Sequence, residues 1–154
     1  MVFSALAQRV EVKNLVAMLD WPAKRIDTTL KKTGYLLLRK DIDSTTSLYE
    51  YSDVDRDEKT DEKPVNVRSL VYMDVSVRNL ESRLITYRTY DKDEYREMLS
   101  YLLANNYHSI NKFDFKEAKH VVYSNGSREI RVKEITTTLK SGRKFIAYEF
   151  ELGR

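Results

Sequence analysis

The sequence predicts an α+β protein: two tandem units, each a helical segment followed by a four-stranded antiparallel meander, packed as one compact protein. Three observations predict this fold. A chain of 154 residues can bury one sizeable core. Its apolar residues recur first at helical spacing and then at every second position. This order of elements occurs twice, so the predicted units span residues 10–90 and 91–154, after a short segment at 1–9.

Short matches between the two halves indicate an internal repeat. Tyr35 and Tyr107 each follow a helical segment and lie 72 positions apart. Later, Leu70 matches Ile130 at an offset of only 60. We interpret the polar residues 54–66 as an acidic insertion in the first unit that accounts for this change. The last strands match at an offset of 61, which places Tyr87 opposite Tyr148.

Both helical segments carry start and stop signals. Asp91 and Glu94 predict an N-cap and a capping box for the second unit, and Asn105-Asn106 suits the turn that ends its helix. In the first unit, Pro22 suits the first turn of a helix and Gly34 suits its end. The apolar stripe of the second helix consists of Tyr95, Met98, Leu99, Leu102 and Leu103.

Period-two alternation predicts eight strands, four in each unit. Short connections, such as the Asn125-Gly126 turn, predict that consecutive strands pair antiparallel. One face of such a sheet can hold the helices while the other stays open. The predicted strands span residues 35–40, 48–51, 67–77, 83–90, 110–115, 120–123, 129–137 and 144–152.

The composition removes most kinds of catalytic and metal site. The chain has no Cys, which excludes thiol chemistry and Cys-based metal sites. It has only two His, which argues against most kinds of His-based catalysis and His-rich metal sites. The acidic run from Asp53 begins like a calcium loop, but Glu58 replaces the required Gly and Pro64 the required Glu. No apolar run reaches the ~20 residues of a membrane span. We therefore predict no enzyme, no metal, no cofactor and no transmembrane segment.

The first residues predict export. Ala5-Leu6-Ala7 matches the pattern that signal peptidase cleaves, with Gln8 as the first mature residue. We interpret residues 1–9 as the remnant of a signal peptide, which predicts a periplasmic or secreted protein. The alternative is an apolar first turn that packs on a cytoplasmic protein.

Tyrosine is enriched, at 11 of 154 residues, and most of these residues fall on predicted strands. Ordinary strand propensity explains many of them. Tyr and Arg are also favoured at the centres of protein interfaces, so an open sheet face rich in both predicts a binding surface. The predicted partner-binding residues are Tyr49, Tyr51, Tyr72, Arg88, Arg131 and Lys133.

The elements around residues 21–35 and 91–107, with the strands that follow them, resemble the β-lactamase inhibitor protein architecture. A small lipoprotein family of the outer-membrane assembly machinery resembles one such unit. The resemblance covers nearly the whole chain as topology, but the disulfides of the inhibitor family are absent because the chain has no Cys. It implies a non-catalytic, exported binding scaffold whose two sheets lie side by side and present a long concave face.

The leading functional hypothesis is non-enzymatic recognition of a protein or an envelope component through the open face. One alternative is a binder of an anionic ligand or of single-stranded nucleic acid through the basic sheet of the second unit. In that case Arg131 and Lys133 would contact phosphates, and Phe113 and Phe115 would stack on bases. Another alternative is a small carrier that holds an apolar ligand between helix and sheet. The sequence leaves the oligomeric state open.

Overall fold

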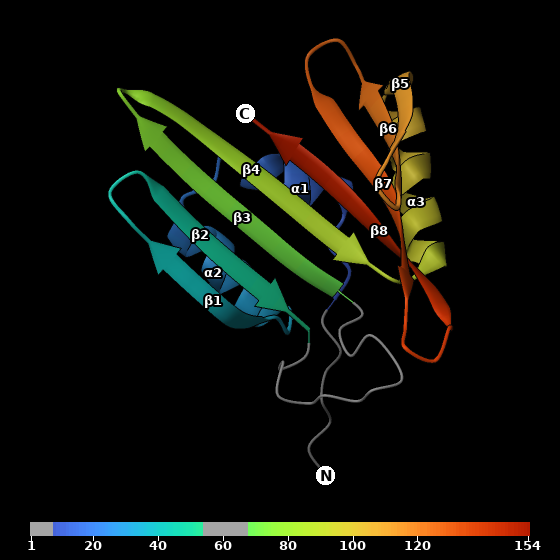
Figure 1. The fold of residues 1–154 in the computed structure, drawn as a ribbon. Coiled ribbons are helices and arrows are strands. Elements are labelled where there is room, and N and C mark those ends of the chain that lie inside the picture. The colour runs from blue at the N-terminus through green and yellow to red at the C-terminus, as the bar shows by residue number, and fades with distance from the viewer. Residues whose placement is uncertain (1–7, 54–67) are drawn as a thin grey trace.

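One antiparallel sheet of eight strands forms the body of the protein (Figure 1). The computed structural model describes residues 8–53 and 68–154. The strand order across the sheet is β1-β2-β3-β4-β8-β7-β6-β5. The strands are β1 (Leu36–Ile42), β2 (Thr46–Ser52), β3 (Arg68–Val77), β4 (Leu80–Thr89), β5 (His108–Phe115), β6 (Ala118–Ser124), β7 (Glu129–Thr138) and β8 (Lys144–Gly153).

The three described helices cover one face of this sheet. They are α1 (Val12–Met18), α2 (Ala23–Lys32) and α3 (Lys92–Ala104). In Figure 1, α1 and α2 lie behind the sheet and α3 lies at its right-hand side, next to β5, β6 and β7. None of the described helices is long and apolar enough to cross a membrane. The opposite face carries no described helix and is called the open face below.

The predicted fold class is wrong. The molecule is not a balanced α+β arrangement of two helix-plus-four-stranded units. Strand makes up 52 % and helix 23 % of the described residues, and all eight described strands share one sheet. The physical reason is the pairing of β4 with β8, which joins the two halves edge to edge. Antiparallel pairing of consecutive strands within each half is confirmed.

The register of the two halves corresponds closely at the outer strands. A bulge lies between Leu37 and Arg39 in β1, and another lies between Ser109 and Asn111 in β5, 72 positions later. A bulge inserts one extra residue and bends its strand. Both edges of the sheet therefore bend at equivalent positions.

The inner strands correspond at different offsets. Leu70 opposes Tyr87 in the β3–β4 pair, and Ile130 opposes Leu152 in the β7–β8 pair. If Leu70 is matched with Ile130, then Tyr87 corresponds to Leu152, at an offset of 65. The predicted match of Tyr87 with Tyr148 is therefore not the one that the register gives. The equivalent bulges and the equivalent strand order of the two halves are what a duplication would produce. The internal repeat itself stays a prediction.

The core lies between the helices and the sheet. Leu15, Ile26 and Leu30 of the helices are at most 1 % exposed. They meet alternate residues of the strands, such as Leu70 and Phe150, which are fully buried. Burial of this apolar surface is the main stabilising contribution to the fold.

The predicted helix boundaries are largely confirmed, with one correction. The Asp91 side chain accepts hydrogen bonds from the backbone N–H groups of Asp93 and Glu94, which is the predicted N-cap. The capping box does not form, because the Glu94 side chain is buried and bonds elsewhere. Gly34 and Asn106 both have positive φ, at 95° and 63°, and so end their helices in the left-handed conformation.

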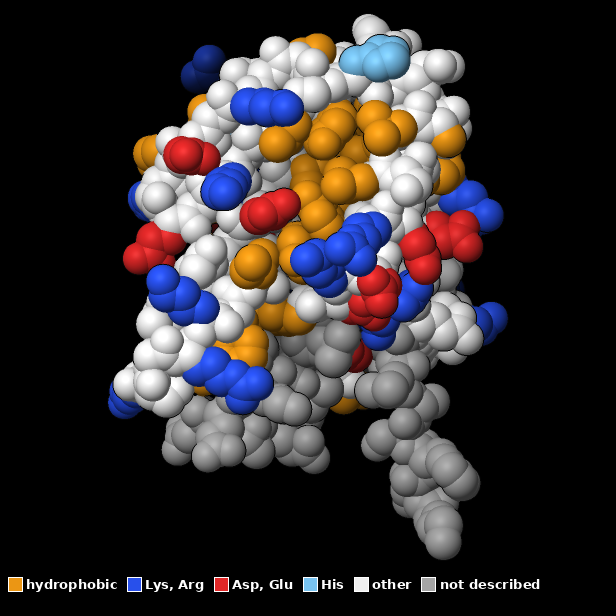
Figure 2. All heavy atoms as spheres, turned by 90° about the vertical axis from the view of Figure 1, so that its right-hand side faces the viewer, with side chains coloured by type: hydrophobic (Ala, Val, Ile, Leu, Met, Phe, Trp, Pro, Cys, Tyr) orange, Lys and Arg blue, Asp and Glu red, His pale blue; other side chains and the backbone are white. Residues whose placement is uncertain are grey.

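The edge of the sheet next to α3 is the least covered. All eight residues of β5 are exposed. Figure 2 looks at the side formed by α3, β5 and β6, and shows a band of hydrophobic side chains with charged side chains on both flanks. Leu103 of α3 and Ile110 of β5 are 62 % and 56 % exposed. This edge is therefore an apolar surface without a described covering element.

Two predicted features lie outside the described residues. One is the Ala5-Leu6-Ala7 pattern on which the export prediction depends. The other is the acidic insertion at 54–66.

Tyr72→Ala should lower the free energy of unfolding by about 3–5 kcal/mol, because its ring is fully buried and its removal leaves a large cavity. Urea unfolding followed by circular dichroism measures the loss. Tyr101→Ala, at a half-buried position on α3, is the control and should cost less. A Tyr72→Ala protein within about 0.5 kcal/mol of the wild type would contradict this placement.

Candidate functional site

A row of side chains crosses the centre of the open face. Paired residues of antiparallel strands lie on the same face. Arg88 of β4 opposes Glu149 of β8, which opposes Lys133 of β7. Lys133 in turn opposes His120 of β6, which opposes Phe113 of β5. Five strands therefore each contribute one side chain to the same row.

The charged members of this row form an ionic ladder together with the row beside it. Arg88 donates two hydrogen bonds to Glu149 Oε2, at 3.0 and 2.7 Å. Lys133 Nζ donates to Glu149 Oε1 at 3.1 Å and to Glu151 Oε2 at 2.8 Å. Arg131 Nη1 lies 3.4 Å from Glu151 Oε1. The ladder therefore links β4, β8 and β7 through three cations and two carboxylates.

The ladder changes the titration of its members. Burial by itself would raise the pKa of Glu149, but hydrogen bonds from Arg88 and Lys133 outweigh it and hold this pKa below its ordinary value. Burial would lower the pKa of Lys133, but hydrogen bonds to Glu151 and Glu149 raise it. The contacts therefore favour the charged forms of both groups.

Apolar side chains flank the ladder toward β5. The His120 ring stacks on Phe113, with 4.7 Å between the ring centroids, and meets Phe115 edge-on at 6.4 Å. Phe113 and Phe115 are 39 % and 58 % exposed. His120 is only 8 % exposed, and its Nδ1 atom has no hydrogen-bond partner among the described residues.

The other flank, toward β1, is also partly apolar. Met73 and Leu84 oppose each other on the open face, next to Val71 on the neighbouring row. Leu84 is 36 % exposed, and Val71 and Met73 are half-buried. The open face therefore has a polar, charge-paired centre with apolar side chains on both sides.

The structure separates the six predicted partner-binding residues into two groups. Arg88, Arg131 and Lys133 lie together in the ionic ladder of the open face. Tyr51 and Tyr72 are fully buried on the helix-covered face, where they cannot contact a partner on the open face.

Tyr49 belongs with the buried tyrosines. It lies on the same face as they do, and its ring stacks on Tyr72 with 4.6 Å between centroids. The alternation of β3 contained the signal for this placement, because Tyr72 is two residues from the apolar Leu70 and shares its face. The three tyrosines contribute to packing rather than to the open face.

Sequence reasoning missed Glu149 and Glu151. Both lie at alternate positions of β8, a spacing that puts them on one face. The sequence shows this spacing, but it does not predict that β8 pairs with both β4 and β7. This pairing brings cations from two strands, Arg88 of β4 and Lys133 of β7, to one carboxylate, Glu149.

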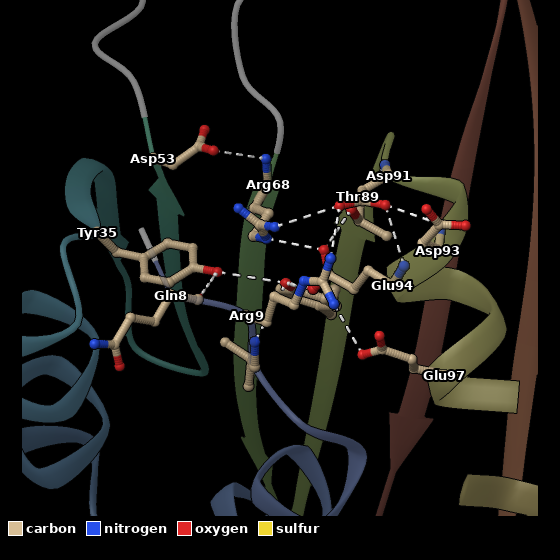
Figure 3. A network of polar contacts seen from close by, with 12 residues as sticks. Gln8, Arg9, Tyr35, Asp53, Arg68, Thr89, Asp91, Asp93, Glu94 and Glu97 are labelled. Atoms are coloured by element: carbon tan, nitrogen blue, oxygen red, sulfur yellow. Dashed lines mark hydrogen bonds and ion pairs between the residues drawn. The ribbon is translucent and has the colours of Figure 1, made fainter. Parts of the chain in front are cut away.

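A second polar cluster lies inside the protein, on the helix side of the sheet (Figure 3). Glu94 of α3 is 2 % exposed and accepts a hydrogen bond from Arg68 Nε at 2.9 Å. It also accepts bonds from the hydroxyl groups of Tyr87, at 2.6 Å, and Thr89, at 2.9 Å. This cluster ties α3 to β3 and β4.

The same cluster holds the start of the described chain. The Tyr35 hydroxyl donates to the Gln8 carbonyl oxygen at 3.0 Å. Arg9 reaches both Asp91, at 3.1 Å, and Glu97, at 2.8 Å (Figure 3). These bonds join the first described residues to the sheet and to α3, so we assign the cluster a structural role.

The described residues offer little for a bound cofactor or metal. No group of three or more His, Cys, Asp or Glu side chains among them could hold a metal ion. A groove of about 310 Å³ lies between the N-terminal segment and α3, and its lining includes Val10, Met98 and Tyr101. We assign no chemistry to this groove.

Glu94→Gln should lower the free energy of unfolding by about 3–5 kcal/mol, because it removes the charge that compensates the buried Arg68. Urea denaturation measures the change. Glu97→Gln is the matched control on the same helix, where the ion pair with Arg9 is exposed and contributes at most about 1 kcal/mol. Equal losses in the two variants would contradict the assigned role of Glu94.

The depressed pKa of Glu149 predicts a pH dependence. A carboxylate whose folded pKa lies below its unfolded pKa stabilises the protein above the unfolded value, and this contribution is lost as pH falls through the folded value. Glu149→Gln should therefore be less stable than the wild type at neutral pH, by about 1–3 kcal/mol. The difference should shrink as the pH is lowered to about 3.

Urea unfolding at several pH values measures this difference. Glu129→Gln, at an exposed position of β7, serves as the control and should show little difference at any pH. A gap between Glu149→Gln and the wild type that stays constant down to acid pH would refute the predicted contribution.

No family model, curated protein or solved structure matches the chain. The resemblance to the β-lactamase inhibitor proteins therefore stays a prediction from the sequence. The geometry of the open face carries the functional argument that follows.

Proposed function

We propose that the protein is a non-enzymatic binding protein that recognises a protein partner through its open face. The observation that carries this proposal is the ionic ladder of Arg88, Glu149, Lys133, Glu151 and Arg131, flanked on both sides by apolar side chains. Protein interfaces combine apolar contact area with charged groups that fix orientation and exclude wrong partners. The open face offers both on a rigid sheet.

Charge pairing favours a protein over a nucleic acid as the partner. Affinity for phosphates comes mainly from cations that neutralise the backbone and release counterions. On the open face, Arg88, Lys133 and Arg131 each contact a carboxylate. The ladder carries a net charge of only +1, so few of its cations are free to neutralise a phosphate backbone.

Packing between helices and sheet supports a surface function over an apolar carrier. Leu19 and Ile26 of the helical segments and Ile85 of β4 are fully buried there. These side chains occupy the space in which a carrier would hold its ligand. We therefore place the partner on the open face.

The predicted export fixes the compartment in which we expect that partner. If Ala5-Leu6-Ala7 is the end of a signal peptide, the partner is an extracellular or envelope protein.

Site-specific photo-crosslinking in producing cells tests the proposed function. A benzophenone side chain at Thr86, in the middle of the open face, should form a discrete protein adduct after irradiation. The control carries the same group at Thr28, an exposed position of α2. An Arg131→Glu background should reduce the Thr86 adduct roughly tenfold, because it repels Glu151 and disrupts the ladder.

Three outcomes would overturn the proposal. They are no adduct from Thr86, equal adducts from Thr86 and Thr28, and a Thr86 adduct with nucleic acid. Fluorescence anisotropy with labelled oligo-dT measures nucleic-acid binding directly. A steep decline of its affinity with salt would establish the alternative.

A further inference from the structure

We propose that two copies of this chain associate through their β5 edges, with antiparallel pairing centred on Phe113. The proposal concerns the edge of the sheet and is independent of what the open face binds. It starts from the position of β5, which pairs with β6 on one side and ends the sheet on the other. An edge strand presents unpaired backbone N–H and C=O groups that can bond to another strand.

The side chains of β5 are complementary to themselves. A two-fold axis perpendicular to the sheet through Phe113 places Phe113 opposite its own copy. Lys112 of each copy then opposes Asp114 of the other, because paired positions lie equally far on either side of the axis. Opposite charges directly across an antiparallel pair stabilise it, and facing aromatic rings do the same.

In this pairing, side chains that oppose each other must lie on the same face of the joined sheet, and those of β5 do. Lys112 opposes Val121, which opposes the core residue Val132, so Lys112 and Asp114 lie on the helix side. Phe113 lies on the open face beside His120. Both ion pairs would therefore form on one side of the joined sheet and the aromatic contact on the other.

Neighbouring registers are disfavoured. Moving the axis to Lys112 would place two lysines opposite each other, and moving it to Asp114 would oppose two aspartates. Like charges in this position destabilise a strand pair. Within the described part of the chain, neither Lys112 nor Asp114 forms an ion pair, even though Lys119 lies across from Asp114. Both charges thus remain available to a second copy.

The opposite edge of the sheet lacks this complementarity. Lys40 in β1 corresponds to Lys112 at the offset of 72. Self-pairing of β1 that brings Arg39 opposite Asp41 centres on Lys40 and so places two lysines face to face. Arg39 and Asp41 already form an ion pair within one copy. We therefore assign the association to the β5 edge alone.

The contact is short, since the bulge at Ser109/Asn111 limits regular pairing to residues 111–115. Interfaces of this size are typical of weak association. We expect a monomer–dimer equilibrium that depends on concentration, in which two open faces join into one continuous surface.

Reversing the charges of Lys112 and Asp114 tests this proposal. Sedimentation velocity on the full chain measures how strongly each variant dimerises. Lys112→Asp and Asp114→Lys each replace two attractive pairs with two repulsive ones and should weaken dimerisation by roughly tenfold or more. An equimolar mixture of these two variants restores opposite charges at both positions and should form heterodimers. The double variant K112D/D114K should dimerise like the wild type.

The control is Lys40→Asp, which makes the same charge change at the other edge and should leave dimerisation unchanged. A wild-type chain that sediments as a monomer up to millimolar concentration would overturn the proposal. So would a dimer that neither single variant weakens, one that Lys40→Asp dissociates, or single variants that fail to associate when mixed. Circular dichroism of each variant confirms that it is folded.

Discussion

The pairing of β4 with β8 is the contact on which the rest of the structure depends. Among the described strands, every other pair joins neighbours in the sequence, whereas this pair joins the two halves of the chain. On its helix side Tyr87 opposes Phe150 in the core, and on its open side Arg88 opposes Glu149. The backbone hydrogen bonds between β4 and β8 thus join the two halves into a single core on one face of the sheet. On the other face, the same pairing brings together the residues of the ionic ladder.

The two described polar clusters lie on opposite faces of the sheet and differ in how far they are shielded from water. The cluster around Glu94 and Arg68 lies inside, where its charges are shielded from water and each must be compensated. The ladder around Glu149 lies at the surface, where Arg88 and Arg131 keep partial contact with solvent. The inner cluster ties α3 to β3 and β4, whereas the outer ladder leaves its two arginines partly exposed to solvent.

Local signals in the sequence predicted local structure well. The capping residue Asp91, the left-handed positions Gly34 and Asn106 and the period-two strands all depend on near neighbours in the chain. The pairing of β4 with β8 depends instead on how two distant edges fit, and no sequence window contains both. The fold class was wrong for this reason, although the individual elements were placed within a few residues.

The same distinction separates the candidate residues. Arg131 and Lys133 could be selected from the sequence because they lie two residues apart and so share one strand face. Arg88 could be selected because Arg on a predicted strand suits the centre of an interface. Glu94 could not be recognised as buried, because its position in a capping box already explained it. Its buried state follows from contact with Thr89 of β4, five residues before it, and with Arg68 of β3, 26 residues before it. It therefore depends on how α3 folds back onto these two strands.

The charge pairing of the open face has a consequence for the kind of binding that it supports. A partner that covers the ladder need not desolvate isolated charges, because each cation already has a carboxylate to neutralise it. If the open face binds the proposed partner, the main gain would come from the apolar flanks, such as Phe113 and Leu84, and the ladder would select partners whose own polar groups fit between its charges. We therefore expect the open face to discriminate between partners mainly through the ladder and to hold them mainly through its flanks.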